Sequence, residues 1–126
     1  MASDRSKPEI DFPAGEPPSD LVVVDDIDGD GTEAVAGSTV LAHYVGVAHS
    51  TGEEFDASWG RGEPLSFRLG VGQVIAGWDQ GIAGMRVGGR RTLTIPPHLG
   101  YGDRGAGSAI KGGETLIFVV DLVDVR

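Results

Sequence analysis

Cysteine is absent from this sequence, and so are long hydrophobic runs. Without cysteine the chain of 126 residues can form neither a disulfide framework nor a thiolate nucleophile, and we expect a cytoplasmic protein. No stretch approaches the roughly 18 consecutive apolar residues of a membrane-spanning helix, so no membrane association is expected. Residues 1–18 are polar and proline-rich, which is not typical of a secretory signal.

Basic residues are also scarce. The chain has 10 Lys and Arg against 19 Asp and Glu, a formal net charge of −9. Residues 1–33 contain ten acidic and two basic residues, a net of −8, whereas residues 34–126 contain nine and eight, a net of −1. No basic stripe is left to neutralise phosphates, and the sequence therefore predicts no nucleic-acid partner.

Proline content and strand-like segments divide the chain into two parts. Residues 1–19 hold four of the seven prolines and little apolar periodicity, which predicts a flexible, acidic, proline-rich tail. Residues 20–126 are expected to form one folded domain. Their β-branched and alternating segments predict strands at 21–27, 38–48, within 50–58, and at 64–70, 88–97 and 114–125. The last of these is the longest apolar run and is expected to be a central strand.

The segment QVIAGWDQGIAGM, residues 73–85, has helical periodicity. Apolar side chains recur at spacings of three, four and three residues, at Ile75, Trp78, Ile82 and Met85. Gly77, Gly81 and Gly84 each weaken such a helix by roughly 1 kcal/mol relative to alanine, so it must pack on the sheet to be stable. We therefore predict an α+β fold, an antiparallel β-sheet wrapped around one short α-helix.

An acidic turn resembles the start of a calcium-binding loop. Asp26, Asp28 and Asp30 stand at positions one, three and five of the segment 26–37. Position twelve is Gly37, where such a loop needs a bidentate glutamate, and no helix is expected on either side. The sequence therefore predicts a turn between two strands and no metal site.

Two other patterns do not indicate cofactor or catalytic chemistry. The segment GYGDRG, residues 100–105, matches a dinucleotide-binding fingerprint, but no helix can begin after it. His43, His49 and His98 are too widely spread for a catalytic triad or a metal centre. We expect no cofactor.

The aromatic residues allow two interpretations. Apart from Phe12, the aromatic side chains come from separate elements of the folded domain, and most could simply fill its core. Tyr44 and Tyr101 need hydrogen-bond partners if they are buried, and Asp56 could supply one. These groups could therefore converge on a concave apolar site. Composition and spacing alone do not choose between a packed core and a binding site.

The sequence as a whole resembles a known family. Segments that carry the resemblance are VLAHYVGV followed by GEEFDAS, GQVIAGWDQGIAGMRVGGRRTLTIPP, LGYGDRGAG and TLIFVVDLV. In this order they are similar to the single-domain FKBP-type peptidyl-prolyl cis/trans isomerases, from about Leu21 to Val125. The resemblance implies a curved antiparallel sheet closed over a short helix, and a monomeric enzyme that accelerates rotation of X-Pro bonds and assists protein folding. It also implies inhibition by macrolides of the tacrolimus and rapamycin type.

The same resemblance assigns candidate site residues. Those implied to act in catalysis are Asp56, the Tyr101 hydroxyl and the backbone N–H of Ile75. Those implied to bind proline-containing peptides or unfolded proteins are Tyr44, Phe55, Arg61, Leu65, Val74, Trp78, Ile110 and Phe118. Trp78 is expected to form the floor of the pocket, and Arg61 to be the partner of Asp56 or of Tyr44.

Several positions depart from the family pattern, and other functions stay open. The departures lie on the pocket rim and its flap, at Leu65, Gln73, Ala106, Ala109 and the segment KGG after Ile110. They leave open substrate preference and a non-catalytic module that grips proline-containing partners. A folding helper that acts through surface hydrophobicity is the other alternative, and the short flap argues against it. A further hypothesis makes Phe12-Pro13 of the tail a ligand for a neighbouring molecule.

Overall fold

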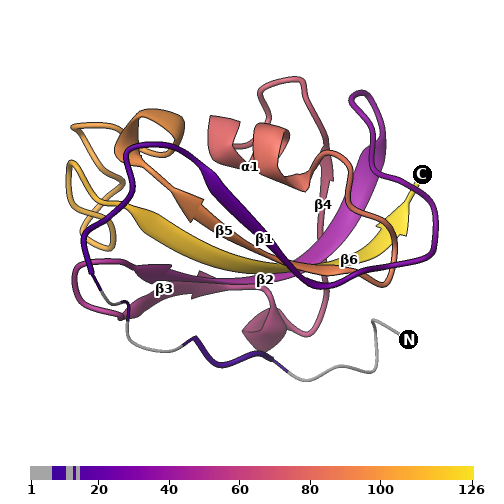
Figure 1. The fold of residues 1–126 in the computed structure, drawn as a ribbon, viewed down its shortest axis with the longest axis horizontal. Coiled ribbons are helices and arrows are strands. Elements are labelled where there is room, and N and C mark those ends of the chain that lie inside the picture. The colour runs from indigo at the N-terminus through magenta and orange to yellow at the C-terminus, as the bar shows by residue number, and fades with distance from the viewer. Residues whose placement is uncertain (1–6, 11–12, 14) are drawn as a thin grey trace.

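The fold is an antiparallel β-sheet that curves around one short α-helix (Figure 1). A computed structural model of the chain describes residues 7–10, 13 and 15–126. Six strands are found in this part of the chain: β1 (Val22–Ile27), β2 (Thr39–Ala48), β3 (Glu54–Ala57), β4 (Leu65–Arg68), β5 (Arg90–Ile95) and β6 (Leu116–Val125). The helix α1 spans Ala76–Ile82, and two short 3-10 helices, η2 and η3, span Trp59–Arg61 and Pro97–Leu99. The predicted α+β class is confirmed.

The two longest strands, β2 and β6, lie side by side in the middle of the sheet. The order is β1-β5-β6-β2-β3, and β4 also pairs with β2. Along β2 the side chains of Val40, Ala42 and Tyr44 enter the core under α1, whereas Val45 and Val47 are buried outside that core cluster. This alternation is the period of two that a strand imposes. The prediction that 114–125 forms a central strand is confirmed.

Two glycines allow α1 to lie directly against β5. A Cβ atom on Gly77 would stand 2.5 Å from Cγ2 of Ile95, and one on Gly81 would stand 2.8 Å from Cδ2 of Leu93. Both partner side chains are fully buried, so neither can move away easily. The glycines that weaken the isolated helix are therefore what lets it pack on the sheet.

The helix is shorter than the apolar stripe that predicts it. Ile75 is the N-cap residue and lies outside α1, and the helix ends at Ile82. Gly84 then adopts a left-handed conformation with φ of +91°, which turns the chain and buries Met85 after the helix has ended. The apolar periodicity of residues 75–85 therefore predicted which side chains pack inward, but it did not predict where the helix begins and ends.

The edge strand β1 is tied to the helix by one arginine. Nε of Arg91, on β5, donates to Oδ1 of Asp25 on β1 at 2.6 Å. Nη1 of the same side chain donates to the carbonyls of Gly81 and Ala83, at 2.8 and 3.1 Å, which otherwise end the helix without partners. Arg91 therefore joins the edge of the sheet to the C-terminus of α1.

Residues 7–10 of the N-terminal segment lie against the outer side of the sheet, beside β2 and β3 (Figure 1). Nζ of Lys7 forms an ion pair with Oε1 of Glu54 on β3 at 2.6 Å. Pro13 borders a cleft with His49 and Lys111, whereas Phe12 of the proposed Phe12-Pro13 ligand is outside the described residues. The division into a flexible tail and a domain stays a prediction. Within the described residues no helix is long and apolar enough to cross a membrane.

Replacing Gly77 with alanine should destabilise the fold. The added Cβ gains about 1 kcal/mol of helix propensity, but it forces Ile95 or the helix to move, and such overpacking typically costs about 1–3 kcal/mol. We expect a net decrease in the free energy of unfolding measured by urea denaturation. Gly60→Ala is the matched control, because a Cβ there has no atom within 4 Å and the backbone is not left-handed. Equal stability of the two variants would contradict the close helix–sheet contact.

Candidate active site

A cavity of about 440 Å³ opens between the start of α1 and the inner face of the sheet. Its lining residues are contributed by four strands, the helix and two loops: Tyr44, Phe55, Asp56, Leu65, Gln73, Val74, Ile75, Trp78, Tyr101 and Phe118. Most of these side chains are apolar or aromatic, and few polar groups point into the space. This composition is typical of a pocket for a small apolar group held in one orientation.

Trp78 forms the floor of the cavity because its neighbours hold the indole ring on three sides. Its ring centroid lies 4.9 Å from that of Tyr44 and 5.2 Å from that of Phe118, with interplanar angles of 76° and 84°. Phe67 packs against it at 5.5 Å. Edge-to-face pairs of this kind add to the burial of the rings and fix their orientation. The floor is therefore a rigid aromatic surface.

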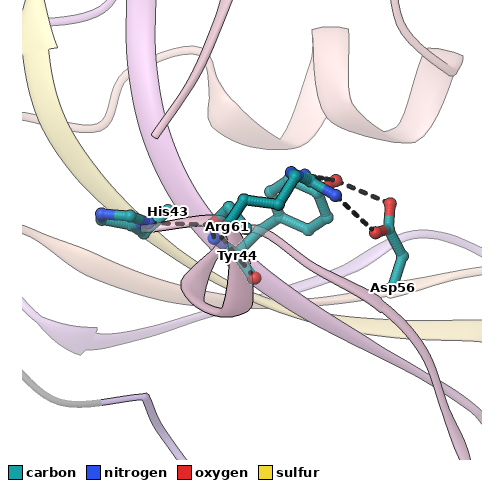
Figure 2. Close-up of polar contacts among 5 residues, drawn as sticks. His43, Tyr44, Asp56 and Arg61 are labelled. Carbon is teal, nitrogen blue, oxygen red and sulfur yellow. Dashed lines mark hydrogen bonds and ion pairs between the residues drawn. The ribbon is translucent and has the colours of Figure 1, made fainter. Parts of the chain in front are cut away.

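One wall carries a carboxylate held by two other side chains (Figure 2). The Tyr44 hydroxyl donates to Oδ2 of Asp56 at 2.6 Å, and Nη1 of Arg61 donates to Oδ1 at 3.2 Å. Nη2 of Arg61 also donates to the Tyr44 hydroxyl oxygen at 2.8 Å. The sequence left open whether Arg61 meets Asp56 or Tyr44, and the structure shows that it meets both. Asp56 is therefore held at both oxygens.

Both tyrosines of the cavity keep their protons at neutral pH. Burial raises the pKa of Tyr44, the Asp56 carboxylate raises it further, and Arg61 acts in the opposite direction. Burial also raises the pKa of Tyr101, with a smaller contribution from the charge of Asp56. Each phenol can therefore act as a hydrogen-bond donor throughout the physiological range.

Comparison with known proteins identifies the family. The sequence model described as FKBP-type peptidyl-prolyl cis-trans isomerase matches residues 31–123, most of the chain. The chain belongs to this family. It is 70% identical over 120 residues to an FK506-binding protein of Streptomyces anulatus, covering 94% of this chain and 97% of that protein. A probable FK506-binding protein of Corynebacterium glutamicum is 53% identical over 117 residues, with coverages of 93% and 97%.

Solved structures support the same assignment. The crystal structure of AtFKBP13 superposes with a TM-score of 0.79 at 46% identity, covering 87% of this chain and 96% of that one. FkpA from Escherichia coli gives a TM-score of 0.77 at 42% identity, covering 84% of this chain and 48% of the other. The relatives in this family are peptidyl-prolyl cis-trans isomerases, and the chain is an enzyme of this type.

Two predicted site residues of this FKBP-type isomerase do not line the cavity. Arg61 lies behind the wall, where it holds Asp56 and Tyr44. Ile110, expected in the wall, packs into the hydrophobic core with 5% of its surface exposed. Its backbone exchanges two hydrogen bonds with Ala106, of 2.8 and 3.2 Å, which close the flap loop and direct the side chain inward. Ile110 is therefore a core residue that anchors the flap, and its contact with substrate stays a prediction.

Two polar residues beside the cavity have structural roles that sequence reasoning did not find. Gln73 lines the cavity, and its Oε1 accepts the backbone N–H of Arg68 at 2.8 Å. Asp79, in the first turn of α1, accepts the N–H groups of Gly70 and Gly72 at 2.7 and 3.0 Å. These bonds hold the loop between β4 and α1 that leads to the cavity wall. The available signal in the sequence was an acidic residue in the first turn of the predicted helix, shortly after two glycines.

Titration of the two tyrosines should confirm their environment. The chain contains only Tyr44 and Tyr101, so Tyr44→Phe and Tyr101→Phe each leave one phenol to follow by ultraviolet absorbance. We expect both to ionise above the usual value of 10.0, because burial disfavours the phenolate. Since folding raises the pKa, their contribution to stability is complete below pH 10 and is lost as pH rises through the folded pKa. A midpoint at or below 10 in either variant would contradict this geometry.

Proposed function

We propose that this chain isomerises X-Pro peptide bonds in the cavity floored by Trp78 and thereby assists the folding of proline-containing chains. The observation that carries the proposal is a pair of open hydrogen-bond donors beside an aromatic pocket. Within the described residues, neither the Ile75 N–H nor the Tyr101 hydroxyl meets an acceptor, and both groups belong to residues that line the cavity. A peptide has carbonyls that can satisfy both donors.

The chemistry requires neither a nucleophile nor a proton transfer. Rotation about a peptide bond must break amide resonance, a barrier of about 18–20 kcal/mol. The planar amide is more charge-separated than the twisted one, and water stabilises it by hydrogen bonding to the carbonyl. A dry pocket withdraws that stabilisation, while fixed groups favour the twisted form. The cavity therefore lowers the barrier by binding the rotated amide better than the planar one.

The lining residues divide into three roles under this proposal. The prolyl ring lies over Trp78, enclosed by the rings of Tyr44, Phe55 and Phe118. The Ile75 N–H and the Tyr101 hydroxyl orient the carbonyls on either side of it. Asp56, fixed by Tyr44 and Arg61, places a negative charge beside the carbon of the rotating carbonyl. Its contribution is electrostatic, because a held dipole or charge needs no reorganisation during rotation.

The proposal extends to macrolides of the tacrolimus and rapamycin type. The relatives are named for FK506 binding, and this cavity offers an apolar floor with two free donors on its rim. A macrolide that occupies the prolyl position blocks the reaction. A cytoplasmic location and a monomeric state complete the proposal and stay predictions from the sequence.

Removing the Asp56 carboxylate or the Tyr101 hydroxyl should reduce the rate of isomerisation without unfolding the protein. In a protease-coupled assay on a Leu-Pro peptide, we expect Asp56→Ala and Tyr101→Phe each to lower kcat/KM about tenfold, which corresponds to about 1.4 kcal/mol of transition-state stabilisation. Asp124→Ala is the matched control, because this half-exposed carboxylate accepts only from Val125 and Arg126 among the described residues and does not line the cavity. Wild-type rates in both variants would refute the assigned roles.

Macrolide binding can be followed by the fluorescence of Trp78, which forms the floor of the pocket. The two tryptophans are Trp78 and Trp59, and Trp59 stacks on His43 away from the cavity. In a Trp59→Phe variant the remaining indole lines the pocket, so we expect rapamycin to change its fluorescence and abolish isomerase activity at the same concentration. Tight binding by a protein that shows no rate enhancement would instead support the non-catalytic binding module.

A further inference from the structure

Behind the Asp56 cluster lies a serine that the proposed mechanism does not use. Ser58 follows β3 directly, precedes η2 and is fully buried. It does not line the cavity and does not contact Asp56. Its position is nevertheless unusual, because the two residues that hold Asp56, Tyr44 and Arg61, both make backbone hydrogen bonds to it.

Ser58 fills a gap in the sheet beside Tyr44. On one edge of β2, residues 45–47 pair with β3 and residues 39–42 pair with β4, so positions 43 and 44 face no strand there. Oγ of Ser58 accepts the Tyr44 N–H at 2.7 Å, and the Ser58 N–H donates to the Tyr44 carbonyl at 3.0 Å. A single residue therefore replaces the missing strand at the point where Tyr44 must be held.

The same residue anchors the arginine. The Ser58 carbonyl accepts the backbone N–H of Arg61 at 3.0 Å, which closes the turn of η2. Tyr44 reaches Asp56 from β2, and Arg61 reaches it from η2 (Figure 2). These two elements are far apart in the sequence, and Ser58 contacts the backbone of both.

A histidine on the far side of Tyr44 orients the serine hydroxyl. Nδ1 of His43 lies 2.9 Å from Oγ of Ser58, and the imidazole stacks on Trp59 with centroids 4.3 Å apart. Burial lowers the pKa of His43, with Asp121 acting in the opposite direction, so the ring is neutral at pH 7. When the ring carries its proton on Nε2, Nδ1 accepts the Ser58 O–H, which leaves an oxygen lone pair for the Tyr44 N–H. The Tyr44 carbonyl, 3.4 Å from Oγ, is the longer alternative acceptor. Both bonds of the hydroxyl are then satisfied.

We propose that Ser58, with its hydroxyl oriented by His43, is a positioning residue for the isomerase reaction. It holds the backbones of Tyr44 and Arg61 so that their side chains fix Asp56 at the cavity wall. Loss of the hydroxyl leaves the Tyr44 N–H without an acceptor in the sheet gap, and the cluster loosens although all of its members remain. This inference rests on the proposed role of Asp56.

The test is a double-mutant cycle on kcat/KM with Ser58→Ala, Asp56→Ala and the combined variant, each measured where circular dichroism shows it to be folded. We expect Ser58→Ala alone to lower kcat/KM about fivefold, the scale of one lost hydrogen bond. In the Asp56→Ala background we expect no further loss, because Ser58 acts through Asp56. A residue that merely stabilised the sheet would give the same ratio in both backgrounds, and that result would overturn the proposal.

Two further variants test the orientation of the hydroxyl and do not alter Ser58. His43→Asn keeps a hydrogen-bond acceptor at the position of Nδ1, and we expect it to retain the wild-type kcat/KM. His43→Leu has no acceptor and should match Ser58→Ala. Equal rates in the two histidine variants would contradict the role of His43, and this comparison decides the matter if Ser58→Ala fails to fold.

A stability control and one reference result complete the design. Ser50→Ala removes a hydrogen bond of 2.6 Å to the buried Glu114, away from the cluster, and should lower stability without changing kcat/KM. If Asp56→Ala itself keeps the wild-type rate, the proposed function of Asp56 fails and the inference about Ser58 falls with it. If Asp56→Ala is impaired and Ser58→Ala is not, the inference about Ser58 alone is refuted.

Discussion

The close contact between α1 and β5 is the constraint on which the cavity depends. Gly77 and Gly81 bring the helix backbone against Ile95 and Leu93. This close approach puts Trp78 in contact with the aromatic rings of Tyr44 on β2 and Phe118 on β6. A helix lying farther out would leave a gap beneath the indole instead of a closed floor. Packing at native density therefore decides both the stability of the domain and the shape of its pocket.

The architecture could be predicted from the sequence because it depends on burial, and burial leaves a periodic pattern. Alternation and β-branched residues located the strands, including the central position of β6. The same signal misjudged the ends of the helix, because it depends on burial and not on backbone conformation. The wall residue Phe55 and the floor residue Trp78 were predicted through family resemblance, since composition alone left a packed core equally open.

The polar contacts around the site could be predicted only in part, because they depend on register between distant segments. Family resemblance made Arg61 the partner of Asp56 or of Tyr44, but it did not show that Arg61 meets both. Arg61 is seventeen residues from Tyr44 in the sequence, and Ser58 reaches Tyr44 only where β3 and β4 leave β2 unpaired. Asp79 holds the preceding loop through the backbone N–H groups of Gly70 and Gly72, and the sequence does not show that these groups meet. Such contacts become visible once the strands are paired, and they decide how firmly the chemical groups are held.

The edge strand β1 has a consequence under the proposed function, in which the substrates include unfolded chains. A free sheet edge offers unpaired backbone groups to any extended polypeptide, and unfolded chains contain such segments. Here the edge carries adjacent aspartates, Asp25 and Asp26, and its register is interrupted between Asp25 and Ile27. An incoming strand would have to bury carboxylates and follow a bulged backbone. The β1 edge is thus a poor template for the assembly of aggregation-prone chains.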